Sequence, residues 1–555
     1  MPVVRVLSCG GKSPSCRVTR WASANGGARI GLLRGGSTVS SLSNGVVDRP
    51  IRPHSVAARR TPPVESIPIE VTSVTLPSID PLSLYTTLAE CRPHDDLYLF
   101  ESLDGPDQDR CAAAVGWGRL AELRFIADRL EVTGDGPLGD ALAAVLTTVL
   151  GEPVRRHAGE GAWRVAGPAQ VWAAVRAVQG AFALRTTAPA DSFAFGFLTT
   201  LAYEAARDMD ELSVDRVVDD IPRCTLALFR HTVWWDLRAG TVRHLCATGP
   251  HLPREDPADS RIPEHLADHP EVPAAPAPSL VRDTVDEETF AARVKQCLRH
   301  IEVGDSYQIQ IGHRIDVETT LTPLEVYRRL RHRNPSPYMY LAPWAGQTVI
   351  GASPELFLRI EGGRLSMRPI AGTAPRGADP ETDHRRIAEL TASEKERAEH
   401  VMLVDLCRND IGRVCVPGTL SVDAMFDVEP FAYVHHLVST VSGQLDDAAD
   451  VWAAICAAFP AGTMTGAPKL RAMEIIDGLE DEPRGVYAGS IGLVDLRGYA
   501  VLALCIRTAV HDGHRYRTQA SAGVVADSTP GAEWRETLAK MSATYWALTG
   551  AELLP

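Results

Sequence analysis

The sequence carries two segments in which acidic residues follow signals for the start of a helix. Ser393 and Glu396 form an S-x-x-E pattern, which predicts that a helix begins there. At about 100° per residue, Glu399 shares a face of this helix with Leu403 and Leu406. A carboxylate on an apolar face needs a partner, because burying it alone is costly. A buried salt bridge and a metal site are both consistent with this pattern.

The second segment starts at Thr529, because a threonine followed by Pro530 is typical of a helix N-terminus. Glu536 and Lys540 follow at the i, i+4 spacing of an ordinary solvated surface pair. Glu536 could instead converge with Glu399. Two carboxylates completed by substrate oxygens and waters suit Mg²⁺, which keeps much of its hydration shell.

Other residues could bind an anion or move a proton. Residues 462–469 combine glycine, threonine and lysine, and residues 369–373 end in Gly-Thr, so both strings are donor loops or ordinary turns. Arg507 lies in an apolar stretch that predicts a strand, where it must pair with an acidic side chain or a substrate carboxylate. His436 is a candidate acid or base, although a lone histidine is more often structural. Together these residues describe a pocket for a dicarboxylate.

Composition excludes several classes of protein. The chain has 555 residues, of which 45% are hydrophobic and 23% charged, as in a globular protein with a sizeable core. The net charge of −14 argues against nucleic acid or an anionic membrane as partner, and no stretch is long enough to span a bilayer. The 11 cysteines are scattered without a CxxC pair, which suits a reducing, cytoplasmic location and indicates no zinc site.

Local composition divides the chain into four parts. Residues 1–66 are predicted to be a disordered or transit-like extension, because positions 1–47 lack acidic residues. Residues 67–250 alternate strand-like and helix-like runs, such as the strand 97–100 and the helix 138–150. Residues 251–280 are a Pro/Ala-rich linker. Residues 281–552 form one mixed block that opens with a helix over 286–303 and a strand over 307–315.

Six strings closely resemble the chorismate-utilising enzymes, above all the large subunit of anthranilate synthase. They are residues 334–339, 351–355, 369–373, 395–413, 459–477 and 519–540. The similarity covers about residues 285–550, and a weaker similarity covers about residues 80–245. The resemblance implies an α+β fold in which two large, mostly antiparallel sheets pack face to face with helices around them. Residues 67–250 would be the regulatory region and residues 281–552 the catalytic domain.

The resemblance also implies roles at the matching positions. Glu399 and Glu536 would hold Mg²⁺. Glu355 would protonate the departing C4 hydroxyl of chorismate, and His436 would assist the later loss of pyruvate. Thr463 and Glu533 would complete the catalytic set. The substrate would be bound by Thr373, Tyr487, Arg507, Ser521, Ala522, Gly523 and Lys540.

Two positions sort the branches of this family. Aminodeoxychorismate synthases carry a lysine where this chain has Ala371, and isochorismate and salicylate synthases carry one in the strand that contains Gln308 here. With both lysines absent, the attacking group should be free ammonia at C2. Ammonia attack gives 2-amino-4-deoxyisochorismate, and anthranilate once pyruvate leaves. Thr465 and Ser521 depart from the anthranilate synthase pattern, and Ser521 could crowd the pocket.

The resemblance extends to partners and regulation. No Cys/His/Glu amidotransferase pattern appears, so ammonia is expected from a separate glutamine amidotransferase subunit. Tryptophan is expected as a feedback inhibitor. Its predicted binding residues are Leu99, Glu101, Ser102, Pro335 and Met339.

Three functions follow in order. The first is the aminating subunit of anthranilate synthase in aromatic amino-acid biosynthesis, an oxo-acid lyase. The second is a 2-amino-4-deoxyisochorismate or 4-amino-4-deoxychorismate synthase. The third, a non-catalytic chorismate-binding paralogue, is disfavoured by the intact acidic residues and Arg507.

Overall fold

The computed structural model describes residues 66–134, 136–210, 212, 221–256, 261–263, 265–267 and 272–554, and the backbone of a short antiparallel pair, β1 (Trp21–Ala22) and β2 (Ala28–Arg29). Residues 1–62 and 63–555 form separate compact units. Apart from β1, β2 and Ser66, the predicted extension lies outside the described residues.

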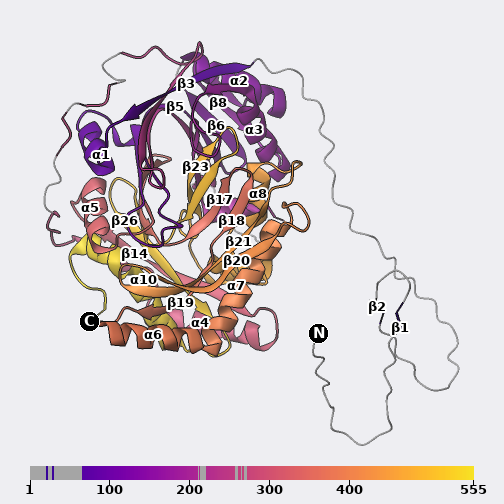
Figure 1. The fold of residues 1–555 in the computed structure, drawn as a ribbon, viewed down its shortest axis with the longest axis vertical. Helices are drawn as coiled ribbons and strands as arrows, with labels where there is room; N and C mark the ends of the chain where they lie inside the picture. Colours follow the sequence, from indigo (N-terminus) through magenta and orange to yellow (C-terminus); the bar gives the residue numbers. More distant parts are fainter. Residues whose placement is uncertain are drawn as a thin grey trace, which may run out of the picture. The chain divides into compact units, whose positions relative to one another are not determined.

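The larger unit is an extensive antiparallel sheet network with helices around it (Figure 1). The helices of the described residues are α1 (Pro81–Ala89), α2 (Gly136–Leu150), α3 (Pro168–Ala181), α4 (Glu287–Glu302), α5 (Pro323–Arg333), α6 (Pro380–Ala392), α7 (Glu394–Gly412), α8 (Val451–Ala458), α9 (Lys469–Leu479) and α10 (Pro530–Thr549).

The strands form two arms that meet in one long ladder. The first arm runs through β9 (Phe182–Thr186), β3 (Ile67–Leu76), β12 (Thr241–Thr248), β11 (Cys224–Asp236), β10 (Gly196–Leu201), β23 (Ser490–Asp495), β24 (Ala500–Leu504), β17 (Leu356–Glu361), β18 (Arg364–Met367) and β21 (Val434–Gln444), which also pairs with β19 (Ile370–Pro375) and β20 (Ser421–Pro430). Among the described strands of this unit, only β3 and β9 pair in parallel.

The second arm starts at β5, which pairs with β11 from Ala112 opposite Asp236 to Phe125 opposite Cys224. It runs through β5 (Ala112–Ile126), β4 (Leu97–Glu101), β15 (Tyr338–Trp344), β16 (Gln347–Ser353), β25 (Thr508–His511), β26 (Tyr516–Val524) and β14 (Gln308–Glu318), which also pairs with β13 (Leu280–Asp283) and β22 (Gly466–Ala467). A smaller extension of β5 consists of β6 (Arg129–Gly134), β8 (Glu160–Arg164) and β7 (Arg155–His157).

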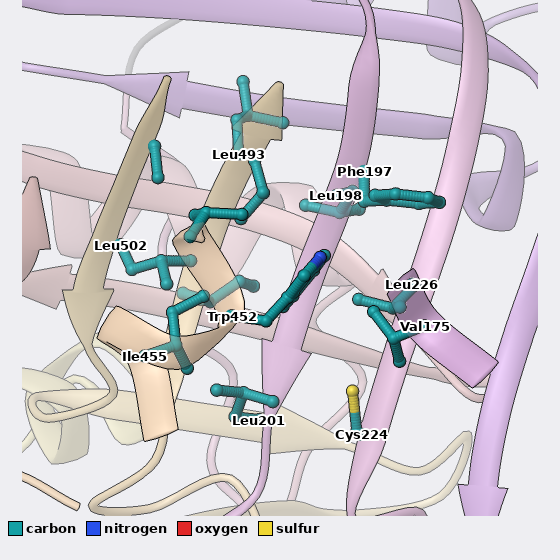
Figure 2. Packing of buried hydrophobic residues seen from close by; sticks show 14 of the residues in the cluster. Val175, Phe197, Leu198, Leu201, Cys224, Leu226, Trp452, Ile455, Leu493 and Leu502 are labelled. Atoms are coloured by element: carbon teal, nitrogen blue, oxygen red, sulfur yellow. The ribbon is translucent and has the colours of Figure 1, made fainter. Parts of the chain in front are cut away.

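Side chains from both arms fill one hydrophobic core, as the prediction of two facing sheets requires. Tyr340 in β15 and Phe357 in β17 are both fully buried in it. Figure 2 shows Trp452 of α8 among apolar side chains that include Phe197 of β10 and Leu493 of β23. The ring centroids of Trp452 and Phe197 lie 6.1 Å apart. Helix α8 is therefore held to the sheet by apolar burial, the main stabilising contribution to folding.

Strands from both halves of the chain pair directly with each other. In the first arm β10 pairs with β23, and in the second β4 pairs with β15. No helix or strand lies in the described residues between Thr248 and Leu280, where the linker was predicted. The regions predicted to be regulatory and catalytic thus share their sheets, and the boundaries between them stay a prediction.

The strongest local predictions agree with the observed elements. Asp286 caps α4 through the Thr289 N–H, and Ser393 caps α7 through the Glu396 N–H. The prediction of a strand through Arg507 was wrong. Strand β24 ends at Leu504 and β25 begins at Thr508, and Arg507 lies between them at φ +52°.

Candidate functional site

A cavity of about 500 Å³ is lined by residues of β14, β19, β21, β26, α7 and α10, among others. Figure 1 labels these six elements. A cavity of this volume is large enough for a small organic substrate. It is lined by twelve of the thirteen residues predicted for catalysis, substrate binding and metal binding: Glu355, Thr373, Glu399, His436, Thr463, Tyr487, Arg507, Ser521, Gly523, Glu533, Glu536 and Lys540. Ala522 does not line it, because its side chain is fully buried on the other face of β26.

Glu355 is placed to act as an acid. It follows β16 and precedes β17, and 7% of its surface is exposed. Burial raises the pKa of its carboxyl to about 8. The Thr463 hydroxyl lies beside this carboxyl, is buried, and makes no hydrogen bond of good geometry with any described residue. At neutral pH the cavity therefore holds a protonated carboxyl next to a hydroxyl that can still bind a ligand.

His436 is held in one tautomer. Its Nδ1 lies 3.1 Å from the carbonyl oxygen of Gly372 and 3.0 Å from the Thr373 hydroxyl. Because a carbonyl can only accept, Nδ1 carries the proton and Nε2 keeps its lone pair. The pKa of this histidine is lowered to about 4, mainly by burial and to a smaller extent by Arg507 and Lys540, against a raising effect of the Gly372 carbonyl. His436 is thus a neutral ring with one nitrogen able to accept a proton.

Acidic side chains from α7 and α10 face each other across the cavity. Burial raises the pKa of Glu399 to about 7, and Glu396, Glu536 and Glu533 also raise it, against a lowering by Lys395. Burial likewise raises the pKa of Glu533, whose Oε2 is buried without a hydrogen-bond partner among the described residues. Such a set of hard oxygen donors, mutually repulsive and incompletely satisfied, fits a Mg²⁺ ion.

Lysines lie beside both predicted metal ligands. Lys540 Nζ lies 2.6 Å from Glu536 Oε1, as the i, i+4 spacing predicted, and donates a hydrogen bond to the Ser521 carbonyl oxygen at 2.9 Å. Lys395 Nζ lies 3.8 Å from Glu399 Oε1. These ammonium groups offset part of the negative charge of the two carboxylates.

Arg507 has no acidic partner among the described residues. Its Nη1 donates to the carbonyl oxygen of Lys540 at 2.6 Å, and burial lowers the pKa of the guanidinium. A cation that borders a cavity and is left without a carboxylate favours an anionic ligand. Of the two alternatives from sequence, the substrate carboxylate therefore fits better than an ion pair within the protein.

A hydrogen-bonded chain joins Tyr487, Ser521 and Gln310. The Ser521 hydroxyl donates to Gln310 Oε1 at 3.1 Å. Tyr487 Oη lies 2.6 Å from Ser521 Oγ, and since the serine has only one proton, the tyrosine must donate in this pair. The Tyr487 hydroxyl is thus engaged with Ser521 and is left as an acceptor only.

The cavity is also lined by residues that were not predicted from the sequence, among them Gln310, Glu396 and Gln519. A signal for Gln310 was present, because the alternating residues 308–311 put both glutamines on one face of β14. Ile309 and Ile311 occupy the other face, which packs into a separate hydrophobic cluster. Gly523 makes room for the glutamines: a Cβ there would lie 2.6 Å from Gln308 Nε2.

The string at 462–469 is only partly a donor loop. Thr463 and Met464 line the cavity, but Lys469 does not. Its ammonium is buried in a salt bridge to Asp410 at 2.7 Å and donates to the Ala458 carbonyl oxygen at 3.0 Å. Of the two interpretations left open for this string, the ammonium of Lys469 therefore fits an ordinary turn and not a donor loop.

The predicted tryptophan-binding residues lie in the second arm. Glu101, Ser102 and Met339 line a separate cavity of about 50 Å³, whereas Leu99 and Pro335 do not. Leu99 is instead part of a hydrophobic core. Glu101 accepts hydrogen bonds from Tyr327 and Arg331 at 2.6 and 2.9 Å, which ties β4 to α5.

Comparison with known proteins now defines the class. A family model described as chorismate binding enzyme matches residues 144–545. The 2-amino-4-deoxychorismate synthase of Streptomyces globisporus is 46% identical over 483 residues, which cover 85% of this chain and 95% of that protein. Anthranilate synthase component 1 of Haloferax volcanii is 37% identical over 498 residues, which cover 86% and 92%.

A solved structure agrees with the fold. Anthranilate synthase component I from Streptococcus pneumoniae superimposes with a TM-score of 0.60 at 29% identity, covering 78% of this chain and 92% of that one. The chain belongs to the chorismate-binding enzyme family, and it has the predicted α+β fold. No helix of the described residues is long and apolar enough to cross a membrane.

Proposed function

We propose that this enzyme aminates chorismate with free ammonia at ring C2 and expels the C4 hydroxyl as water. One observation carries the choice of ammonia: Ala371 and Gln308 line the cavity where matching enzymes of other branches have lysines. The two lysines among the described lining residues, Lys395 and Lys540, lie beside Glu399 and Glu536. The cavity thus offers no unpaired amine to attack the ring.

Departure of the C4 hydroxyl requires a proton, because hydroxide is a poor leaving group. Glu355 supplies it: its pKa of about 8 keeps the carboxyl protonated at neutral pH. Arg507 orients the substrate through a carboxylate, since it has no acidic partner among the described residues. Thr463, next to Glu355, donates to the same region of the ligand.

The carboxylates of Glu399 and Glu536 would hold a Mg²⁺ ion, with Glu533 and Glu396 close by. Mg²⁺ would bind the ring carboxylate and stabilise negative charge on substrate oxygens. Glu399 must be deprotonated to hold it, and its pKa of about 7 makes metal binding weaker at acidic pH.

The first candidate for the final product is anthranilate. Aromatisation requires a base to remove the proton at C2 while pyruvate leaves. His436 fits this role, because it is neutral and its Nε2 has a free lone pair. This observation favours the aminating subunit of anthranilate synthase, an oxo-acid lyase of aromatic amino-acid biosynthesis.

The second candidate stops at the aminated intermediate, 2-amino-4-deoxyisochorismate. Ser521 favours this product. It accepts a hydrogen bond from the Tyr487 hydroxyl, which was predicted to bind the enolpyruvyl carboxylate, the group that leaves in the elimination. A relative named 2-amino-4-deoxychorismate synthase, similar over nearly its whole length, supports the same product. The two candidates share the amination and differ in the elimination alone.

A separate glutamine amidotransferase subunit supplies the ammonia. Relatives named anthranilate synthase component 1 support this arrangement, because the name implies a second component. The isolated chain should then use ammonium salts at high pH and fail to use glutamine.

One incubation tests the proposed activity. The purified chain is mixed with chorismate, Mg²⁺ and ammonium chloride near pH 8.5, and products are separated by chromatography. Fluorescent anthranilate with released pyruvate would establish the first candidate. A non-fluorescent aminated product that keeps its enolpyruvyl group would establish the second. Amination would be refuted if chorismate were not consumed, or if it were consumed without incorporation of nitrogen.

A further inference from the structure

A cluster of metal-binding side chains lies outside the catalytic cavity, on β11, β12 and the segment that follows β12. One donor atom each of His231, Cys246 and Glu255 lies within 4.8 Å of the other two. Nitrogen, sulfur and carboxylate oxygen are the three ligand types that Zn²⁺ uses in proteins. The residues differ in type from the purely acidic set on α7 and α10, so the two clusters favour different ions.

The sheet itself brings these side chains together. His231 and Cys246 are direct cross-strand partners in the antiparallel β11–β12 ladder, so their side chains lie on the same face. His244, two residues before Cys246, shares that face. Glu255 reaches the same point from the chain after β12, and its Oε1 lies 2.5 Å from His231 Nε2.

The surroundings support His231 in the orientation that a ligand needs. Its Nδ1 lies 3.1 Å from His244 Nε2, which leaves Nε2 to face Glu255. A metal-bound histidine commonly uses its other ring nitrogen for such a hydrogen bond. The Trp117 ring stacks on both imidazoles, at centroid distances of 4.8 and 5.4 Å, and restricts their rotation.

Access to the cluster is adequate for an ion. His231 is fully buried, but Cys246 and Glu255 are each partly exposed. Arg230 Nε lies 3.9 Å from the other carboxylate oxygen of Glu255, so Oε1 remains directed at His231. An ion at this point would join two strands to the start of the predicted linker.

We propose that His231, Cys246 and Glu255 bind one Zn²⁺ ion, with His244 as hydrogen-bond partner of His231 and a water as the fourth ligand. The ion clips the chain after β12 to the sheet and stabilises the fold. The assignment is independent of the proposed amination. Without an ion, His244, His231 and Glu255 form a chain of hydrogen bonds, and spectroscopy can distinguish this state from the metal-bound one.

Titration with Co²⁺ distinguishes the metal-bound state from the hydrogen-bonded state. The full chain, without a histidine tag, is first treated with a chelator and then titrated with Co²⁺. Excess Mg²⁺ is present throughout, so that sites made of carboxylates alone are occupied by Mg²⁺ and not by Co²⁺. We expect a cobalt–thiolate charge-transfer band in the near ultraviolet that saturates at one ion per chain and disappears when one equivalent of Zn²⁺ is added. Zn²⁺ should also raise the melting temperature, because it binds the folded state only.

Variants of the proposed ligands test whether the charge-transfer band arises from this cluster. Cys246→Ser should abolish it, and Glu255→Gln should weaken Co²⁺ binding at least tenfold. Cys91→Ser, a change at an exposed cysteine after α1, should leave both unchanged. Both test positions are partly exposed, so these variants should fold, which circular dichroism will verify. Absence of the thiolate band in the parent, or its persistence in Cys246→Ser, would overturn the zinc assignment.

Discussion

The hydroxyl of Tyr487 lies 2.6 Å from Oγ of Ser521 and donates its proton to it, because the Ser521 proton is already engaged with Gln310. The hydroxyl of Tyr487, which was predicted to bind a substrate carboxylate, therefore donates its hydrogen bond to a neighbouring side chain instead. A serine at position 521 thus changes how the cavity can bind an anion, because it engages the hydroxyl of Tyr487.

Ser521→Gly should release the Tyr487 hydroxyl for the substrate. One hydrogen bond to a charged group contributes about 1.5–3 kcal/mol, so the KM for chorismate should fall by a factor of about 10 to 150. Steady-state kinetics with saturating ammonia measures this change. Ser521→Ala separates the two effects of the serine, since it removes the hydroxyl and keeps Cβ. A lower KM in the glycine variant alone would mean that crowding, and not the hydrogen bond, is responsible.

Glu355→Gln should lower kcat by about 100- to 10,000-fold, because the leaving hydroxyl loses its proton donor. Glu361→Gln, at the far end of β17, is the matched control and should retain full activity. The rate of the parent enzyme, expressed per unit of free NH₃, should fall above pH 8, where the Glu355 carboxyl loses its proton. A rate that stays flat to pH 9.5 would exclude Glu355 as the acid.

Glu399→Gln should raise the Mg²⁺ concentration needed for half-maximal activity at least tenfold, because a negatively charged ligand is lost. The carboxyl has a raised pKa of about 7 in the metal-free site, so the parent should need more Mg²⁺ as pH falls through 7. Glu394→Gln, an exposed position at the start of α7, serves as control. An unchanged Mg²⁺ requirement in Glu399→Gln would place the ion elsewhere.

Ala371→Lys should reduce ammonia-dependent amination by at least tenfold, because the new side chain would extend into the cavity where ammonia approaches C2. Ala371→Met adds comparable length without an amine. If both variants lose activity equally, steric exclusion is the cause. If the lysine variant remains as active as the parent, the explanation of why this chain uses ammonia is wrong.

Ser102→Phe should abolish inhibition by tryptophan. The Ser102 hydroxyl donates to the Pro337 carbonyl oxygen at 2.5 Å and lines the small cavity beside β4 and β15, which a phenyl ring would fill. Inhibition curves for parent and variant at fixed chorismate measure the effect. A parent enzyme indifferent to tryptophan would remove the regulatory role from this cavity.

The sequence by itself determined the local elements and most of the cavity wall. The capping pattern at Ser393 placed Glu399 on a helix, and the threonine–proline pair at 529–530 placed Glu536 on another. These signals are reliable because caps and hydrophobic periodicity depend on residues close together in the chain. The resemblance to chorismate-utilising enzymes supplied the roles, and the cavity gathers the predicted residues.

Only the tertiary structure decided which faces of these elements meet. It placed the Lys469 ammonium against Asp410 and engaged Tyr487 with Ser521. It also brought His231 and Cys246 together on neighbouring strands, although scattered cysteines indicated no metal site. Periodicity defines the face of one helix or strand, but pairing between distant segments depends on the packing of the whole chain. Polar side chains therefore find partners that no local pattern can reveal.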